Sequence, residues 1–444
     1  MLVFNIRGLL LYSIEVCLLV ELLPTADSLK RDRKKPRESY VMCPHPRCQC
    51  KPAKHGDVVV RCIKVSERLP QFIKLNITFA EIHLAKKNLT ELPDSGFRGV
   101  RMRLLDIASN PLHVDRINDM AFAGLEDVLE ILWLSDCSLH DIPNGSLSIL
   151  QNLKVLHFEE NLMSEIPSRF LFRNKQLREI YLNRNNIKTI SVNAFAELTN
   201  LKLLKLGQNQ IHSLPAKLFK FLTNLTSLDI SHNLLHDIVP ETFEGLKNLR
   251  WLEMESNMIK SLNRDIFKGA RNLRNMKVEN NQLIIIANNT FRAINKLEYL
   301  SIDIANVSIL TASTFGGLGR LKTMSIGEIV HQRLPDRFLA SMLSLRRLSL
   351  TDSMGKFTGL QKNMFAEKFS FKNLSVFVSP IRSCRCGEQW IRNMTSLGTY
   401  VHGFCVDNRP LSCTGKVFSK VGFGASQKDV NNDRRLKEPE STNT

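Results

Sequence analysis

The strongest constraint on this chain is a sequence unit that recurs with a period of 24 residues between Leu129 and Leu350. LREIYLNRN at residues 177–185 and LKLLKLGQN at residues 201–209 are two copies, each with an alternating apolar run that ends near an asparagine. Such a run suits a half-buried strand. One unit cannot bury its apolar face alone, whereas stacked units bury a continuous core beside parallel strands. The repeat therefore predicts a solenoid.

Two further columns appear when the copies are aligned. One column is phenylalanine and the other is asparagine: Phe195, Phe219, Phe243, Phe267, Phe291 and Phe315, and Asn161, Asn185, Asn209, Asn233, Asn257 and Asn281. A buried amide must be hydrogen-bonded. We therefore expect the asparagines to form a ladder on backbone groups of their own and the next repeat. The phenylalanines are expected to form a spine on the far side of the core.

Cys137 stands at the asparagine position of its own repeat. A small buried thiol can fill that position, and this is the role we predict. A reactive or intermolecular thiol is the alternative, because Cys137 is the odd cysteine once those at the two ends of the array are paired.

The two ends of the chain differ from the repeats. Residues 1–26 begin with a sparse positive charge at Arg7 and continue as an apolar run, which predicts a secretory signal peptide. A membrane span is the alternative, but Glu15 and Glu21 lie inside the run and argue against it. Residues 27–41 form a basic arm and residues 414–444 a polar tail, and both are predicted to be disordered. No apolar run of about 20 residues follows the repeats, so the sequence predicts release from the cell.

Cysteines cluster on both sides of the repeats, at Cys43, Cys48, Cys50 and Cys62 and at Cys384, Cys386, Cys405 and Cys413. In a secreted chain such clusters indicate disulfides. Zinc is the alternative for the first cluster, because His45 lies nearby, and four cysteines alone allow three connectivities. Together, the repeats and the two clusters resemble the extracellular leucine-rich repeat proteins with cysteine-rich caps, a group that includes Slit proteins, proteoglycans and Toll-receptor ectodomains.

The resemblance implies an α/β solenoid, a horseshoe with a parallel concave sheet and a disulfide cap at each end. It places an N-terminal cap at residues 42–74, an array of about twelve repeats at residues 75–379 and a C-terminal cap at residues 380–413. The implied disulfides are Cys43–Cys50, Cys48–Cys62, Cys384–Cys405 and Cys386–Cys413. Both caps are expected to cover the open ends of the core.

The third, fifth and seventh positions of each repeat are expected to point from the concave face into solvent. Aromatic and acidic residues gather there, and we predict a protein-binding surface made of Trp133, His157, Glu159, Tyr181, Trp251, Glu253, Glu255, Glu279, Tyr299 and Asp303. An ordinary solvated strand face is the alternative.

The second position is mostly basic, at Arg103, Lys154, Arg178, Lys202, Arg250, Arg274, Lys322 and Arg346. Stacking aligns these residues along one margin of the sheet. The net charge of the chain is +18, which also favours a polyanionic partner. A glycosaminoglycan such as heparan sulfate is the predicted ligand of this column. The alternative is a solvated edge that keeps strands from pairing with other chains.

Eight N-x-S/T sequons support secretion and predict a glycosylated surface, at Asn76, Asn88, Asn144, Asn224, Asn288, Asn306, Asn373 and Asn393.

The sequence carries none of the motifs GxxxxGK[ST], HExxH or GxSxG, and its eleven histidines show no metal-ligand spacing. We therefore expect no enzyme, no metal and no cofactor, and no nucleic-acid partner because no recognition motif is present. The predicted function is a secreted protein that binds another extracellular protein in signalling, adhesion or the matrix. The alternatives are a glycosaminoglycan- or matrix-associated protein and a non-catalytic subunit that stabilises a secreted enzyme.

Overall fold

The computed structural model describes residues 43–52, 57–62, 69, 72, 78–327, 329, 334–351, 359–381, 389–405 and 410–413. The predicted signal peptide, basic arm and polar tail lie outside these ranges. The side chains of residues 380, 381, 390, 403–405 and 410–413 are not described either. In the described ranges, none of the helices has the length and apolar character needed to cross a membrane.

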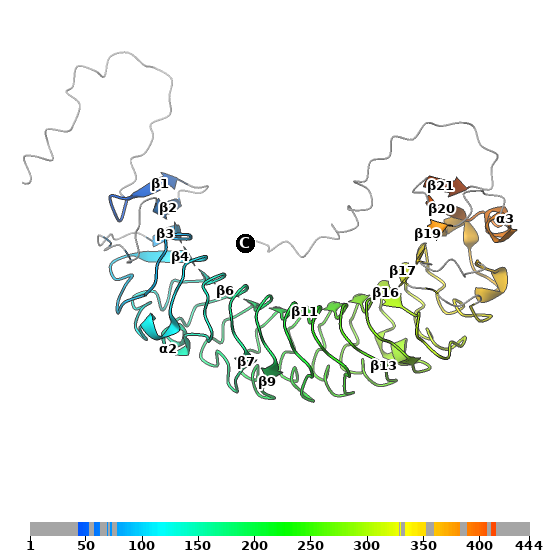
Figure 1. The fold of residues 1–444 in the computed structure, drawn as a ribbon, viewed down its shortest axis with the longest axis horizontal. Helices are drawn as coiled ribbons and strands as arrows, with labels where there is room; N and C mark the ends of the chain where they lie inside the picture. The colour runs from blue at the N-terminus through cyan, green and yellow to red at the C-terminus, as the bar shows by residue number, and fades with distance from the viewer. Residues whose placement is uncertain are drawn as a thin grey trace, which may run out of the picture. The chain divides into compact units, whose positions relative to one another are not determined.

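One long sheet organises the molecule, and its strands lie side by side in the order of the sequence (Figure 1). Each coil of the solenoid adds one parallel strand. The parallel strands are β2 (Val58–Cys62), β3 (Thr78–His83), β4 (Arg101–Asp106), β5 (Ile131–Trp133), β6 (Val155–His157), β8 (Glu179–Tyr181), β10 (Leu203–Lys205), β11 (Ser227–Asp229), β12 (Trp251–Glu253), β14 (Asn275–Lys277), β16 (Tyr299–Asp303), β17 (Thr323–Gly327), β18 (Arg347–Thr351), β19 (Ser375–Ile381) and β20 (Tyr400–Cys405). The predicted solenoid with a parallel sheet is confirmed.

The other side of each coil is built from turns and a few short elements. Two small parallel pairs lie there, β7 (Glu165–Ile166) with β9 (Thr189–Ile190) and β13 (Ser261–Leu262) with β15 (Ile285–Ile286). The described helices are α2 (Asn144–Ser148), α3 (Gln389–Ser396) and the 3-10 turns η4 (Val114–Arg116), η5 (Thr290–Ile294), η6 (Lys362–Met364) and η7 (Phe371–Asn373). Helical content is therefore small for a chain predicted to be an α/β solenoid.

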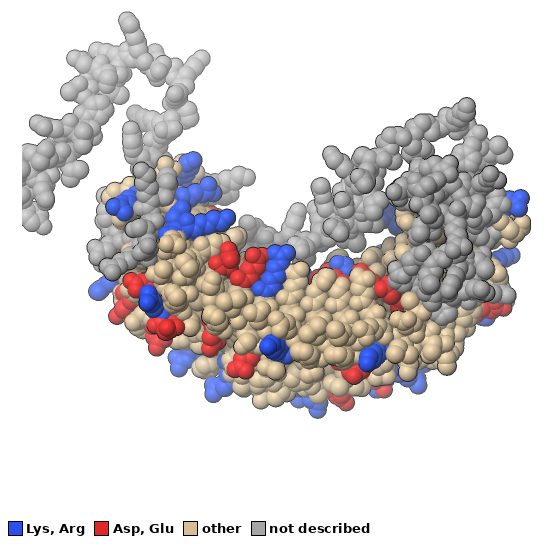
Figure 2. Space-filling model, viewed as in Figure 1, with Lys and Arg blue, Asp and Glu red and all other residues tan. Residues whose placement is uncertain are grey.

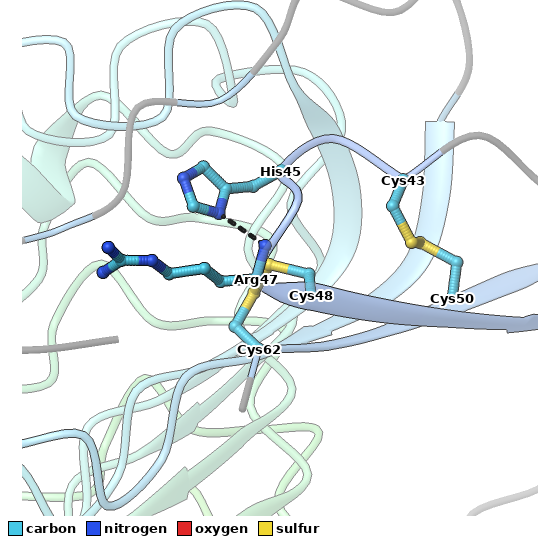
Figure 3. The surroundings of a disulfide bond; sticks show 6 residues. All are labelled: Cys43, His45, Arg47, Cys48, Cys50 and Cys62. Carbon is cyan, nitrogen blue, oxygen red and sulfur yellow. Dashed lines mark hydrogen bonds between the residues drawn. A yellow bond between two sulfur atoms is a disulfide. The ribbon is translucent and has the colours of Figure 1, made fainter. Parts of the chain in front are cut away.

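The sheet ends in antiparallel strands, β1 (Cys48–Pro52) on β2 and β21 (Pro410–Cys413) on β20. At the N-terminal end, disulfides join Cys43 to Cys50 and Cys48 to Cys62 (Figure 3). These are the pairs that the resemblance implies. They also argue against a zinc site, because the sulfurs are bonded to each other and His45 Nδ1 accepts a hydrogen bond from the backbone N–H of Arg47 at 3.1 Å. The cysteine side chains of the C-terminal cluster lie outside the described part, and their pairing stays a prediction.

The core follows directly from the 24-residue period. The fourth repeat position is buried and its neighbours are half-buried in β6, β8, β10, β12 and β14, as in β12, where Leu252 lies between Trp251 and Glu253. The register places equivalent residues of adjacent repeats opposite each other, for example Leu204 and Leu228. Consecutive repeats therefore bury the same side chains against one another, which gives one continuous core.

The predicted phenylalanine spine is confirmed. All six rings, from Phe195 to Phe315, are fully buried. The centroids of Phe243 and Phe267 are 6.1 Å apart, and those of Phe267 and Phe291 are 6.2 Å apart. Burial of one such side chain stabilises the fold by about 1.5–3 kcal/mol, so the column contributes a large share of the inter-repeat packing.

The asparagine ladder is also present, with one correction. Asn209 Nδ2 donates to the carbonyls of Leu182 and Leu206, both at 3.0 Å, and Asn209 Oδ1 accepts from the N–H of Ile187 at 3.0 Å. Leu182 and Ile187 belong to the preceding repeat, not to the next one as predicted. The reason is that the carbonyl of Leu182, just after strand β8, faces the turn that holds Asn209.

Cys137 takes the place of an asparagine in this ladder. Its side chain is fully buried and is a free thiol. The Sγ atom donates to the carbonyls of Ile107 and Ser135, at 3.4 and 3.3 Å. The backbone N–H of Cys137 in turn donates to Asn161 Oδ1 at 3.0 Å. The thiol therefore replaces the amide as a donor to backbone carbonyls of its own and the preceding repeat.

Candidate functional site

Three aromatic rings stack on the strand face near the N-terminal end of the array. Trp133, His157 and Tyr181 occupy the fifth position of consecutive repeats, on strands β5, β6 and β8. The ring centroids of Trp133 and His157 are 4.7 Å apart, and those of His157 and Tyr181 are 4.2 Å apart and nearly parallel. These separations are close to the strand spacing of about 4.8 Å, so the register of the sheet creates the stack. We call these three residues the aromatic shelf.

Two carboxylates, Glu159 just after β6 and Glu179 on β8, hold two rings of the shelf in place. Glu159 Oε1 hydrogen-bonds His157 Nδ1 at 3.1 Å, and Tyr181 donates to Glu179 Oε2 at 2.9 Å. Each pair is two residues apart, and such residues lie on the same face of a strand. Trp133 carries no such bond in the described part and is 38% exposed. The shelf is thus a fixed aromatic surface with its outermost indole open to solvent.

A histidine with two carboxylate partners lies two strands beyond the shelf, on β3. His83 Nδ1 contacts Asp106 Oδ2 at 2.9 Å, and His83 Nε2 contacts Glu81 Oε2 at 2.8 Å. The bond to Asp106, aided by Glu81, holds the pKa of His83 above its ordinary value despite partial burial. Asp106 is the register partner of Trp133. An ion-paired group therefore borders the open end of the aromatic shelf.

Charged residues of both signs occupy the fifth position of the next four repeats, with two acids between two lysines. Lys205 Nζ contacts Asp229 Oδ2 at 3.6 Å and Glu253 Oε2 at 3.1 Å, and Lys277 Nζ contacts Glu253 Oε1 at 2.7 Å. Burial opposes ionisation of Glu253, but the two lysines outweigh it and hold the pKa of this carboxyl below its ordinary value. Of these four residues only Glu253 was among the predicted binding residues, and neither lysine was predicted. The signal that could have found them is the presence of two lysines on either side of two acids at one repeat position.

The seventh position is acidic in the repeats that contain Glu253 and Lys277. Glu255 and Glu279 are half-buried, and each has one carboxylate oxygen that is buried without a hydrogen-bond partner in the described part. Burial raises the pKa of Glu255 to about 7, against the opposing effects of a backbone hydrogen bond and of Lys277, and Glu253 and Glu279 make smaller contributions in the same direction as burial. Asp303, on the next strand, accepts a hydrogen bond from the backbone N–H of Asn280. The charge of this part of the face therefore changes near neutral pH.

The predicted protein-binding residues fall into two groups rather than one. Trp133, His157, Glu159 and Tyr181 lie together at the aromatic shelf. Trp251, Glu253, Glu255, Glu279, Tyr299 and Asp303 lie together on β12, β14 and β16 or directly after these strands. Trp251 is five strands from Trp133, a separation of about 24 Å at the ordinary strand spacing. Most of these side chains are half-buried rather than free in solvent, because neighbours in adjacent strands cover one another.

The predicted basic column is interrupted by ion pairs. Lys154 pairs with Glu130 at 2.8 Å, and Arg274 and Lys322 share Glu298 at 3.0 and 2.6 Å. Arg103 pairs with Asp57. Arg178, Lys202, Arg250 and Arg346 are exposed and form no ion pair among the described residues. On the side of the molecule shown in Figure 2, basic and acidic side chains are likewise interspersed. We call Arg178, Lys202 and Arg250 the basic edge.

Seven of the eight sequon asparagines lie in the described part, and all seven are exposed: Asn88, Asn144, Asn224, Asn288, Asn306, Asn373 and Asn393. Asn76 lies outside it. In the same part, no three His, Cys, Asp or Glu side chains are grouped so that they would hold a metal ion.

Comparisons with known proteins agree with this architecture. A family model described as leucine rich repeat matches residues 127–187, 164–211 and 199–259, and a model described as BspA type leucine rich repeat region matches residues 236–372. A solved structure titled "Crystal structure of TLR13-ssRNA13 complex" is similar in fold, with a TM-score of 0.64 and 23% identity over 73% of this chain. The chain spans only 47% of that structure. A search of curated proteins finds no match.

Proposed function

This chain is a leucine-rich repeat protein, and from that premise we propose that it binds another extracellular protein through its concave strand face. The aromatic shelf is the anchor of this interface. The acidic and lysine-bearing strands beyond it select the partner by charge. Leucine-rich repeat solenoids commonly use their extended concave surface for binding.

The observation that carries the proposal is the fixed stack of Trp133, His157 and Tyr181. Large aromatic side chains dominate the energy of protein interfaces. Their contribution is greatest when the rings are already held in the bound arrangement, because little side-chain freedom is then lost on binding. The bonds from Glu159 and Glu179 supply this restraint, and the exposed indole of Trp133 supplies the contact area.

An extracellular location has separate support. The N-terminal disulfides are typical of an oxidising compartment, and residues 1–26 have the pattern of a signal peptide. The exposed sequon asparagines are compatible with the same route. We therefore propose secretion, with the extracellular space or the matrix as the location.

Partner capture from extracellular fluid tests the proposal. Truncation of a hot-spot aromatic costs at least about 2 kcal/mol, so Trp133→Ala should weaken capture about 30-fold or more. Phe221→Ala is the matched control, because Phe221 is 48% exposed and lies outside the strands of the sheet. Equal capture by wild type and Trp133→Ala would refute the assignment. Capture of an enzyme that loses stability without this chain would instead favour the role of a non-catalytic subunit.

We propose polyanion binding at the basic edge as a second function. The observation in its favour is that Arg178, Lys202 and Arg250 are exposed and lack acidic partners among the described residues. A glycosaminoglycan would be held there mainly by charge, and its binding would weaken with salt. Nucleic acid stays excluded in this proposal, and salt-resistant binding of single-stranded RNA would contradict that exclusion.

A further inference from the structure

The basic edge has a gap at Thr226, the residue between Lys202 and Arg250 in the same column. Thr226 Oγ1 donates to the backbone carbonyl of Lys202 at 3.0 Å, and the backbone N–H of Arg250 donates to the carbonyl of Thr226 at 2.8 Å. The three residues therefore lie on adjacent coils at one margin of the sheet. Since adjacent strands are about 4.8 Å apart, Thr226 is one coil away from a positive charge on each side.

The gap coincides with a glycosylation sequon, Asn224-Leu225-Thr226. Asn224 is exposed, and its Nδ2 donates to the carbonyl of Thr199 on the preceding coil at 3.0 Å. Equivalent bonds to the preceding coil are made by the asparagines at the same repeat position, Asn200, Asn248 and Asn272. Asn224 therefore belongs to a regular column on the same margin, two residues before the column of the basic edge.

We propose that Asn224 carries an N-linked glycan that covers the basic edge and restricts its access to polyanions. This inference rests on the proposed polyanion binding of the edge and on the proposed secretion. The glycan donor is an oligosaccharide linked to a lipid pyrophosphate. Nδ2 of Asn224 forms a bond to the anomeric carbon, the bond from that carbon to the pyrophosphate oxygen breaks, and Nδ2 loses one proton.

The geometry is compatible with the modified side chain. Nδ2 keeps one hydrogen after the transfer, so its bond to the carbonyl of Thr199 can persist and can orient the glycan. A glycan is bulky and well solvated, and this one is attached to the coil between those of Lys202 and Arg250, two residues before Thr226. A linear polyanion that follows the margin would meet it before contacting both charges. The threonine in this column thus replaces a cation and also completes the sequon.

Heparin chromatography of the full chain secreted from mammalian cells tests the inference, with glycopeptide mass spectrometry at Asn224. We expect a glycan at Asn224 in the wild type. Asn224→Gln and Thr226→Val each remove the sequon, and both should elute at a higher NaCl concentration than the wild type, by similar shifts. Asn393→Gln is the matched control, because it removes an exposed sequon on α3 at the far end of the array. Its elution should equal that of the wild type.

Three results would overturn the inference. The inference fails if mass spectrometry finds Asn224 unmodified. It also fails if Asn224 is glycosylated but Asn224→Gln and Thr226→Val elute at the same NaCl concentration as the wild type, because the glycan then does not restrict access to the basic edge. A shift for Asn393→Gln as large as that for Asn224→Gln would show a general effect of glycans. If heparin retains neither the wild type, with Asn224 glycosylated, nor any variant, then the proposed polyanion binding of the basic edge is wrong. This result is distinguishable from the three above, because in those the proteins are still retained by heparin.

Discussion

Replacement of Asn233 by alanine is the most direct test of the asparagine ladder. Asn233 is 5% exposed. Its Nδ2 donates to the carbonyls of Leu206 at 3.0 Å, Ile230 at 3.2 Å and Ser231 at 3.0 Å, and its Oδ1 accepts from the N–H of Ile211 at 3.0 Å. Asn233→Ala removes all four bonds at once, but their loss does not have equal consequences.

The carbonyls are protected by the regularity of the ladder. Leu206 still accepts from Asn209, and Ile230 still accepts from Asn257, both at 3.0 Å. The N–H of Ile211 has no second acceptor among the described bonds. An unsatisfied buried group costs about 1–3 kcal/mol, and loss of the shared bonds adds about 1 kcal/mol. We therefore expect the free energy of unfolding to fall by about 2–4 kcal/mol.

Asn248→Ala is the control, since Asn248 is exposed and makes one side-chain bond, to the carbonyl of Thr223 at 2.9 Å. Its cost should stay below about 1 kcal/mol. Asn233→Asp should destabilise more than Asn233→Ala, because a carboxylate cannot donate and would face the carbonyl oxygens. Urea unfolding followed by circular dichroism measures all three variants. Equal losses for Asn233→Ala and Asn248→Ala would refute the reasoning.

Two further predictions concern single side chains. The folded protein binds the proton of Glu255 more tightly than the unfolded chain does, because burial raises the pKa of this carboxyl from 4.5 to about 7. Stability should therefore fall as the pH rises through this interval. In Glu255→Gln the pH-dependent loss in the free energy of unfolding should be smaller by about 1–2 kcal/mol, a value that allows for the partial exposure of the group. Urea unfolding at several pH values measures this loss, and identical pH profiles of wild type and variant would contradict the prediction. Burial also raises the pKa of the Cys137 thiol to about 12, so iodoacetamide should label it only after unfolding. Rapid labelling of the native protein, followed by mass spectrometry, would support the alternative of a reactive thiol.

The sequence was most informative where one pattern repeats. The period alone predicts the solenoid, and the columns predict both the spine that contains Phe267 and the ladder that contains Asn209. It was less informative about partners within a column. Arg274 and Lys322 were predicted as ligand-binding cations, but in the structure both pair with Glu298. The aromatic and acidic residues were predicted to form one surface, whereas Trp133 and Trp251 lie in separate groups, five strands apart.

The sequence by itself determined the fold, because the inward-facing side chains are copied from repeat to repeat and each copy buries the same apolar surface. It also determined which residues share a column, since a constant period sets the register. Only the tertiary structure decided which neighbours in a column touch. The stack of Trp133 on His157 and the clamp of Lys205 and Lys277 on Glu253 depend on distances between side chains from strands 24 or 48 residues apart. These contacts cannot be predicted from the period, because the outward-facing residues differ from one repeat to the next and their side chains meet only when the coils pack side by side.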